Sequence, residues 1–269
     1  RQRQMCIRDS MDLGLQSRTA LVCAASAGLG RASALALAQA GVAVTITGRN
    51  EEKLAAAAKE LAEASGAKIS FAAGDITTPE GRAAALSVCP SPDILVNNAG
   101  GPPAGDFRSF SEQDWQDALN ANLLTPIALI KAVIDPMIER KWGRIVNITS
   151  GSVKAPIPHL GLSNTARTGL TGFIAGLSRQ VAQHNVIINN LLPGAFDTDR
   201  LQKLAKIEAE KSGKSIEEVV KSRAAGLPTR RVGQPEEFGA MCAFLCSQYA
   251  GYIVGQNILM DGGNINSTF

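Results

Sequence analysis

The stretch VCAASAGLGRA, residues 22–32, contains residues that could bind a phosphate. Gly28 and Gly30 let the backbone approach a pyrophosphate, which would lie against the free N–H groups at the start of a helix, where the dipole favours negative charge. Two glycines before a helix are weak evidence by themselves. Here they follow an apolar run and precede the alanine-rich segment RASALALAQAG. We therefore predict a dinucleotide phosphate site at this turn.

A second candidate binding residue follows the next apolar run, in the segment TITGRNEEK, residues 45–53. A carboxylate at this place would accept a hydrogen bond from the 2′-hydroxyl of NAD, whereas an arginine can form paired hydrogen bonds with the 2′-phosphate of NADP. The chain has Arg49 here. This residue is either a solvated loop charge or a phosphate ligand, and we predict NADP(H) as the preferred cofactor, with NAD(H) as the alternative.

The cysteines give no sign of a disulfide framework or a metal site. There are five, an odd number, and none forms a CxxC pair. This usage favours a reducing compartment, so we expect a cytoplasmic protein that holds no metal. Cys242 and Cys246, one helical turn apart among apolar neighbours, are predicted to be buried packing residues.

Short apolar runs alternate with helical patterns along almost the whole chain. Strands that are apolar throughout and separated by helices are typical of a parallel sheet covered on both faces, so we predict the α/β class with a Rossmann-like, doubly wound sheet. About seven strands are expected, at Ala20–Ala24, Ala43–Thr47, Ile69–Ala72, Ile94–Asn97, Arg144–Thr149, Val186–Leu192 and Asn257–Met260.

Helix boundaries are marked by capping residues and prolines. Gly41 and Gly66 are predicted to end helices, because glycine adopts the left-handed conformation that closes a last turn. Helix starts are indicated at Thr78-Pro79, at Ser111 and at Pro235.

One domain is expected, because 269 residues with 45% hydrophobic content contain no linker or internal repeat. Residues 11–269 form this domain, and the basic stretch 1–10 is interpreted as a foreign or disordered leader, with Met11 as a plausible start. Residues 199–227 are a charged helical insertion, either a solvated surface excursion or a lid over the substrate. A net charge of +3 without a long basic run gives no reason to expect nucleic acid or a membrane as partner, while acidic small ligands stay open.

Further motifs, in their order and spacing, resemble those of classical short-chain dehydrogenases/reductases, nearest to the 3-oxoacyl-[acyl-carrier-protein] reductase-like branch. The resemblance covers residues 13–263. The TGxxxGxG turn of this family appears as CAASAGLG, residues 23–30, with Ala24 in place of the first glycine. The other matching motifs are GDIT (74–77), NNAG (97–100), NANLL (120–124), NITSGS (147–152), PGAFDT (193–198) and MDGG (260–263).

The resemblance implies a set of cofactor contacts. In the family, the aspartate of the GDIT motif caps the adenine ring, the NNAG motif lines the adenine side and the PG motif lies beside the nicotinamide. Carried over to this chain, the expected cofactor-binding residues are Ala24, Ser26, Gly28, Leu29, Gly30, Arg49, Asp75, Ile76, Asn98, Ala99, Gly100, Arg167, Pro193, Gly194 and Thr198.

The resemblance also implies catalytic positions, two of which are altered. Ser150 matches the serine that hydrogen-bonds the substrate carbonyl, and Asn122 matches the asparagine that organises a proton-relay water. The family's proton-donating tyrosine is replaced by Ser163, and the lysine that lowers its pKa and binds the nicotinamide ribose is replaced by Arg167. A serine hydroxyl is shorter and far less acidic than a phenol, and an arginine keeps its proton near neutral pH.

Other groups could supply the proton, and more than one function stays open. Lys154 and His159 lie in the loop between Ser150 and Ser163, and a water held by Asn122 and Ser150 is a further candidate. The protein is then either an NADP(H)-dependent oxidoreductase acting on a small-molecule carbonyl or secondary alcohol, or a non-catalytic, regulatory nucleotide-binding homologue. A serine hydrolase is disfavoured, because Ser163 does not stand in a GxSxG elbow and neither histidine has an evident acid partner.

Assembly is indicated by the segment ANLLTPIALIKAVI, residues 121–134, which is apolar over more of its surface than packing on one sheet requires. The family commonly forms tetramers through its long helices and its last strand. We therefore predict a homotetramer, with a homodimer as the alternative.

Overall fold

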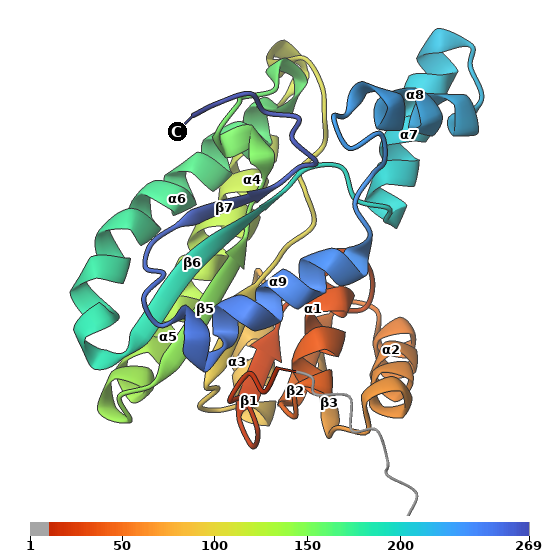
Figure 1. The fold of residues 1–269 in the computed structure, drawn as a ribbon. Coiled ribbons are helices and arrows are strands. Elements are labelled where there is room, and N and C mark those ends of the chain that lie inside the picture. Colours follow the sequence, from red (N-terminus) through yellow and green to blue (C-terminus); the bar gives the residue numbers. More distant parts are fainter. Residues whose placement is uncertain (1–10, 269) are drawn as a thin grey trace, which may run out of the picture.

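The computed structural model describes residues 11–268, which contain a seven-stranded parallel sheet in the order β3-β2-β1-β4-β5-β6-β7 (Figure 1). The predicted leader at residues 1–10 lies outside the described residues. Because the strand order runs outward in both directions from the neighbouring strands β1 and β4, the predicted doubly wound α/β fold is confirmed. The strands are β1 (Thr19–Val22), β2 (Ala43–Gly48), β3 (Ile69–Ala73), β4 (Ile94–Asn97), β5 (Gly143–Ile148), β6 (Val186–Pro193) and β7 (Asn257–Met260).

The predicted strands all form, and the largest difference is at the end of β1. This strand was expected to reach Ala24 but ends at Val22. The reason is local, because Ala24 has a φ of +46° and turns the chain out of the extended conformation.

Two layers of helices enclose the sheet and create two cores (Figure 1). Neighbouring strand residues such as Leu95 and Val96 belong to different cores, because successive side chains of a strand point to opposite faces. The first core lies under α1 (Gly28–Gln39), α2 (Glu51–Ser65) and α9 (Pro235–Cys246). The second core lies under α3 (Pro79–Val88), α5 (Thr125–Glu139) and α6 (Gly161–Val181).

Capping residues fix several helix ends as predicted. The Thr78 hydroxyl accepts a hydrogen bond from the Gly81 N–H at 3.0 Å, and Ser111 forms a capping box with Asp114. Gly66 closes α2 in the left-handed conformation, with φ +71°. The predicted burial of Cys242 and Cys246 is confirmed.

A π-helical turn, Asn120–Leu124, joins α4 (Glu112–Leu119) to α5. The sequence did not predict this turn. π-helical turns inside α-helices are frequent at functional sites. The joined stretch Glu112–Glu139 is long and apolar enough to cross a membrane by length and composition alone, a test that core helices of soluble proteins also pass. Its α5 part buries Leu129 and Met137 in the second core, which is the packing of a core helix.

Residues 199–227 form two helices, α7 (Asp199–Ser212) and α8 (Ile216–Gly226), that project from the body of the fold (Figure 1). They pack on each other through a small cluster of their own, which contains Ala205, Ala209 and Val219. The predicted helical insertion is therefore present, and its role as a lid stays a prediction.

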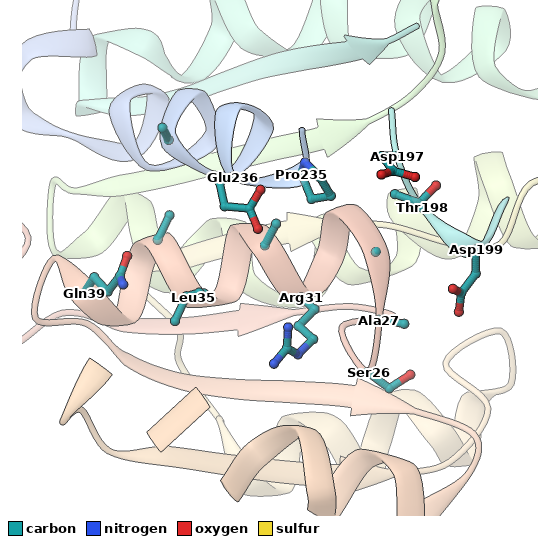
Figure 2. A pocket seen from close by; sticks show the side chains of 14 residues that line it. Ser26, Ala27, Arg31, Leu35, Gln39, Asp197, Thr198, Asp199, Pro235 and Glu236 are labelled. Atoms are coloured by element: carbon teal, nitrogen blue, oxygen red, sulfur yellow. The ribbon is translucent and has the colours of Figure 1, made fainter. Parts of the chain in front are cut away.

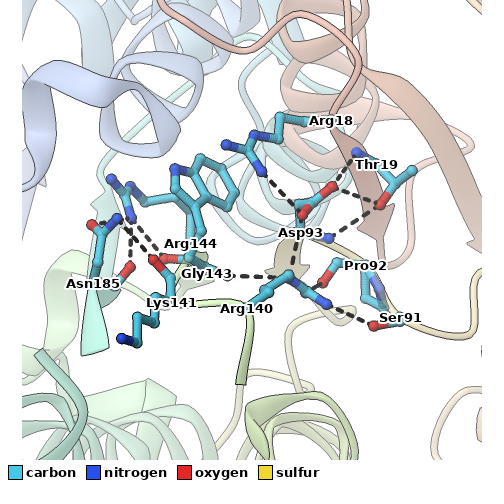
Figure 3. Close-up of polar contacts among 11 residues, drawn as sticks. Arg18, Thr19, Ser91, Pro92, Asp93, Arg140, Lys141, Gly143, Arg144 and Asn185 are labelled. Carbon is cyan, nitrogen blue, oxygen red and sulfur yellow. Dashed lines mark hydrogen bonds and ion pairs between the residues drawn. The ribbon is translucent and has the colours of Figure 1, made fainter. Parts of the chain in front are cut away.

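The amino-terminal edge of the sheet is held by a polar network (Figure 3). The Asp93 carboxylate accepts hydrogen bonds from the Thr19 N–H at 2.9 Å and the Thr19 hydroxyl at 3.1 Å, and forms ion pairs with Arg18 and Arg140. These contacts join the starts of β1 and β4 to the loop before β5. Strand starts that lie far apart in the sequence are therefore tied together at this edge.

Candidate active site

The glycine turn between β1 and α1 is shaped by its own backbone. Gly28 has a φ of +59°, which favours glycine. A Cβ atom on Gly30 would lie 2.5 Å from the Ala24 carbonyl oxygen and 2.8 Å from Asn98 Nδ2. Gly30 is thus required by the packing of the turn itself, a reason that the sequence did not predict. The turn therefore keeps its shape independently of any ligand.

Hydrogen bonds hold this turn against two neighbouring strands. The Ala25 N–H donates to the Thr47 carbonyl oxygen at 3.0 Å, and the Ala24 N–H donates to the Thr47 hydroxyl at 3.3 Å. Asn98, which follows β4, donates from Nδ2 to the Ala24 carbonyl oxygen at 3.3 Å. Ala24 thus keeps a left-handed conformation that costs a residue with a Cβ about 1–2 kcal/mol.

A cavity of about 350 Å³ opens beside the turn and runs between α1 and α9 (Figure 2). It brings together three of the predicted cofactor residues, Ser26, Gly28 and Thr198. A Cβ atom on Gly28 would lie 3.7 Å from Thr198 Cγ2, so the two residues face each other across a narrow gap. The start of helix α1 and the segment after β6 therefore form opposite sides of one cradle.

The PG motif is fixed by the last strand. The Gly194 N–H donates to the Met260 carbonyl oxygen at 2.8 Å, and a Cβ atom on Gly194 would lie 2.6 Å from the Asp261 Cα. The motifs PGAFDT and MDGG therefore pack directly on each other. Pro193 is the last residue of β6, so this contact sets the course of the chain toward Thr198.

Arg49 and Asp75 lie after neighbouring strands, at the ends of β2 and β3. The Asp75 carboxylate accepts hydrogen bonds from the Thr77 N–H at 2.9 Å and the Thr77 hydroxyl at 2.8 Å. These bonds, with a contribution from the positive charge of Arg49, lower the pKa of Asp75. Arg49 itself is exposed and free to meet a ligand from solvent.

Other predicted cofactor residues differ in how deeply they are buried. Ile76 is buried in the second core and Leu29 packs against the first, so both can contact a ligand chiefly through their backbone. Ala99 is partly buried and Gly100 is exposed, in the loop that follows β4.

Four asparagines form a ladder across β4, β5, β6 and β7. Asn97 donates from Nδ2 to Asn147 Oδ1 at 2.9 Å, Asn147 to Asn190 at 3.0 Å, and Asn190 to Asn257 at 2.8 Å. The four residues are in register in the sheet. At one end of the ladder, Asn97 Oδ1 is buried without a hydrogen-bond donor among the described residues. The ladder connects the strands whose carboxyl ends carry the site.

Ser150 and Asn122 are held by local hydrogen bonds. The Ser150 hydroxyl accepts a hydrogen bond from the Ser152 N–H at 3.1 Å, at the end of β5. Asn122 is buried in the π-helical turn, where its Nδ2 donates to the Ala118 carbonyl oxygen at 3.3 Å. Its Oδ1 has no donor within the part of the chain that the structure describes. An oxygen of this kind can bind a water.

Ser163 and Arg167 are buried one turn apart on α6, each with 7% of its surface exposed. Arg167 donates from Nη1 to the Ile148 carbonyl oxygen at 2.7 Å, which fixes its guanidinium at the end of β5. Burial, and then the positive charge of Arg200, lower the pKa of Arg167 to about 10. Arg167 therefore stays charged at neutral pH.

The loop between Ser150 and Ser163 holds Lys154 and His159 on the surface. Both are exposed, and neither side chain forms a hydrogen bond or ion pair with residues 11–268 in the interactions described. The backbone of His159 does contribute, since its carbonyl oxygen accepts a hydrogen bond from the Gly105 N–H at 2.9 Å. This bond joins the loop after β5 to the loop after β4.

Sequence reasoning missed Arg200 and the asparagine ladder. Arg200 lies in the first turn of α7 and donates to the carbonyl oxygens of Gly101 at 3.3 Å and Pro102 at 3.0 Å, so it joins the loop after β4 to the segment after β6. Its sequence signal was a cation two residues after Thr198. The signal for the ladder was an asparagine in each of four strands, which has meaning only once the register is known.

Comparisons with known proteins agree with this geometry. The family model described as short chain dehydrogenase matches residues 18–209. The chain is 34% identical over 259 residues to 3-oxoacyl-[acyl-carrier-protein] reductase FabG of Aquifex aeolicus, covering 94% of this chain and 99% of that protein. It is 32% identical over 258 residues to the NADPH-dependent reductase BacG of Bacillus subtilis, covering 94% of this chain and 100% of that protein.

Solved structures give the same result. L-sorbose reductase from Gluconobacter frateurii, complexed with NADPH and L-sorbose, has a TM-score of 0.91 and 28% sequence identity, covering 96% of this chain and 100% of that chain. The resemblance inferred from the sequence motifs is therefore confirmed. The chain belongs to the short chain dehydrogenase family, in the branch similar to 3-oxoacyl-[acyl-carrier-protein] reductase.

Proposed function

We propose that this chain is an NADP(H)-dependent oxidoreductase that acts on a carbonyl group or a secondary alcohol of a small molecule. The observation that carries the proposal is the hydrogen bond from Arg167 to the Ile148 carbonyl oxygen, because it fixes a cation of α6 at the end of β5, near Ser150. The glycine turn lies at the same edge of the sheet. A phosphate cradle, a hydroxyl and a fixed cation at one edge are components that hydride transfer to a polarised carbonyl requires.

The residues present fit a dinucleotide. Gly28, with its positive φ, faces Thr198 at the start of α1, where a pyrophosphate can bind free N–H groups. Arg49 is exposed after β2, where it would bind the 2′-phosphate of NADP beside Asp75. The relatives named as an NADPH-dependent reductase and as an NADPH complex support this preference. NADPH, when bound, supplies the hydride.

The chain's own residues would position the substrate and the proton. The Ser150 hydroxyl would donate a hydrogen bond to the carbonyl oxygen, and Arg167 would hold the nicotinamide ribose. Ser163 cannot replace a phenol, because its hydroxyl is not acidic enough and its side chain is shorter than that of tyrosine. We expect the proton to come from Lys154, from His159 or from a water held by Asn122 and Ser150. The Asn122 Oδ1 lacks a donor among the described residues and could accept a hydrogen bond from this water.

The cofactor assignment is tested by titrating the protein with NADPH and NADH. NADPH is expected to bind more tightly, and Arg49→Asp is expected to reverse the order, because the carboxylate repels the 2′-phosphate and accepts a 2′-hydroxyl. Lys68→Asp, at an exposed position just before β3 and so at the opposite edge of the sheet, makes the same change of charge and should leave the order unchanged. Equal affinities of the unmutated protein for NADPH and NADH would contradict the predicted preference for NADP(H).

Catalysis is tested by the double change Ser163→Tyr with Arg167→Lys, which should raise the rate of reduction of generic ketones. The reason is that Ser150 and Asn122 still position the carbonyl and the water, so the change adds only the missing acid. If His159 or Lys154 is the acid in the unmutated protein, its replacement by alanine abolishes the activity.

A non-catalytic, regulatory nucleotide-binding role is the second candidate function. It is favoured by the replacement at Ser163 and by the exposure of Lys154 and His159, which lie outside the buried part of the site. A double mutant that binds NADPH yet reduces no ketone would support this second role.

We also propose a cytoplasmic homotetramer or homodimer. Two exposed apolar side chains support self-association. Leu124, just before α5, is 54% exposed, and Phe173, on α6, is 37% exposed. A monomeric mass by light scattering would contradict the assembly.

A further inference from the structure

Arg167 is a buried cation with most of its hydrogen-bond donors unused. A guanidinium has five N–H donors, and here one bond is formed with the described residues, from Nη1 to the Ile148 carbonyl oxygen. Within residues 11–268, no carboxylate lies at ion-pair distance from this side chain. Burial of a charge that is neither paired nor fully hydrogen-bonded is costly. The site therefore favours a ligand that supplies acceptors and negative charge.

Arg200 adds a second positive charge to the same site. Its guanidinium is held by the carbonyl oxygens of Gly101 and Pro102, so it is fixed over the loop that follows β4. Its charge contributes to the lowered pKa of Arg167, so the two cations lie within electrostatic range of each other. Arg200 is exposed and is also without a carboxylate partner among the residues that the structure describes. A ligand arriving from solvent would meet Arg200 before Arg167.

Unsatisfied hydroxyls flank Ser150, independently of the two arginines. Thr149 and Ser152 are buried, with 3% and 1% of their surfaces exposed. Their hydroxyl oxygens have no hydrogen-bond partner in the described part of the chain. Buried polar atoms of this kind are uncommon and often mark a ligand or a water site. Two buried hydroxyls that need partners thus lie within two residues of Ser150 along the chain.

We propose that the substrate is an anionic ketone or the corresponding alcohol, whose carboxylate or phosphate is bound by Arg200 and attracted by the buried charge of Arg167. The inference rests on the proposed oxidoreductase function and adds the substrate class to it. Arginine suits this role, because its planar guanidinium forms paired hydrogen bonds with carboxylates and phosphates. Arg200 is the specificity-determining residue, since it selects the charged group. The same chemistry could come from a phosphate of the cofactor, and the test separates the two sources.

The test measures binding by calorimetry, with and without saturating NADP⁺, so that no turnover occurs. Two matched pairs of probes are used, levulinate with methyl levulinate and dihydroxyacetone phosphate with dihydroxyacetone. Each anion is expected to bind about tenfold or more tightly than its neutral partner, the scale of one charge-assisted hydrogen bond. Arg200→Gln should abolish the preference, and Arg200→Lys should restore part of it. Lys203→Gln removes a charge from an exposed position one turn further along α7 and should change nothing.

Each outcome decides the inference separately from the proposed function. Equal binding of anion and neutral partner by the unmutated protein overturns the inference, even where NADPH reduces both ketones. An Arg200→Gln variant that binds NADP⁺ more weakly but keeps the preference for anions also overturns it, because Arg200 would then hold the cofactor's phosphate. Arg200-dependent binding of anions without reduction of any ketone by NADPH supports the inference and contradicts the oxidoreductase function. If Arg200→Gln does not fold, the inference is decided by Arg200→Lys and by the ratio of the affinities of the unmutated protein for each anion and its neutral partner.

Discussion

Two buried arginines lie at opposite ends of β5 and differ in how their charges are satisfied. Arg144, at the amino-terminal end, is 2% exposed and donates to the carbonyl oxygens of Gly143 and Ser247 and to both oxygens of Asn185. Its guanidinium also lies 4.7 Å from the centre of the Trp142 ring (Figure 3 shows its contacts with Asn185). Arg167, at the carboxyl-terminal end, has one hydrogen bond to the described residues.

The difference separates a stabilising edge of the sheet from a functional edge. Neither arginine has a carboxylate partner in the described part of the chain, so the contrast lies in hydrogen bonds. The fold can satisfy a buried guanidinium with carbonyl oxygens and an aromatic ring, as it does for Arg144. Incomplete satisfaction and strain, as at Arg167 and Ala24, are expected where a site has been shaped for a ligand.

Loss of Arg144 should have the largest effect on stability. Arg144→Met keeps the length of the side chain but leaves the carbonyl oxygens of Gly143, Asn185 and Ser247 without this donor. We expect the free energy of unfolding to fall by about 3 kcal/mol, because buried hydrogen bonds to a charged group are lost. Urea denaturation measures this, and the affinity of the folded variant for NADPH should be unchanged. A loss below about 1 kcal/mol would show that this edge is not the stabilising one.

Disruption of the asparagine ladder should have the second largest effect on the free energy of unfolding. Asn190→Ala removes two ladder bonds and leaves Asn147 Nδ2 and Asn257 Oδ1 without those partners. We expect a loss of about 2 kcal/mol, the cost of leaving buried polar atoms unsatisfied. Asn264→Ala, at an exposed position, is the control and should be neutral in the same denaturation assay. If the two variants are equally stable, the ladder contributes no net stability.

Loss of Arg167 should not lower the free energy of unfolding, in contrast to loss of Arg144. Arg167→Met removes a buried charge that has one hydrogen bond and is repelled by Arg200. We expect the free energy of unfolding to stay the same or to rise by about 1 kcal/mol, because an apolar side chain of similar volume avoids the desolvation of the charge. Binding of levulinate should be weaker, because one of the two positive charges near the anion is removed. Destabilisation as large as that of Arg144→Met would break the comparison between the two edges.

Strain at Ala24 should give the smallest effect. Ala24→Gly removes the Cβ atom from a residue with a φ of +46°, so we expect a gain of less than about 1 kcal/mol, reduced by the entropy that glycine loses on folding. Ala104→Gly is the matched control, because Ala104 is exposed, lies outside helices and strands and does not have a positive φ. The control should be neutral or slightly destabilised. A gain in stability for both variants would mean that Ala24 is not strained.

Much of the fold could be predicted because its signals are local. The apolar runs predicted seven parallel strands with small boundary errors, and capping residues such as Thr78 and Gly66 marked helix ends. The exception at the end of β1 arose because the φ of Ala24 is imposed by contacts with Thr47 and Asn98. A window of sequence around residue 24 does not contain either partner.

The sequence by itself determined the class of fold and the glycine turn, since each depends on residue types at fixed spacing, and it predicts the replacements at Ser163 and Arg167. The tertiary structure decided which side chains meet. The charge of Arg200 acts on Arg167, which lies in another helix, and the four asparagines align through the register of the strands. Such contacts join residues far apart in the sequence, and their energies depend on distance and burial, which only the folded chain defines.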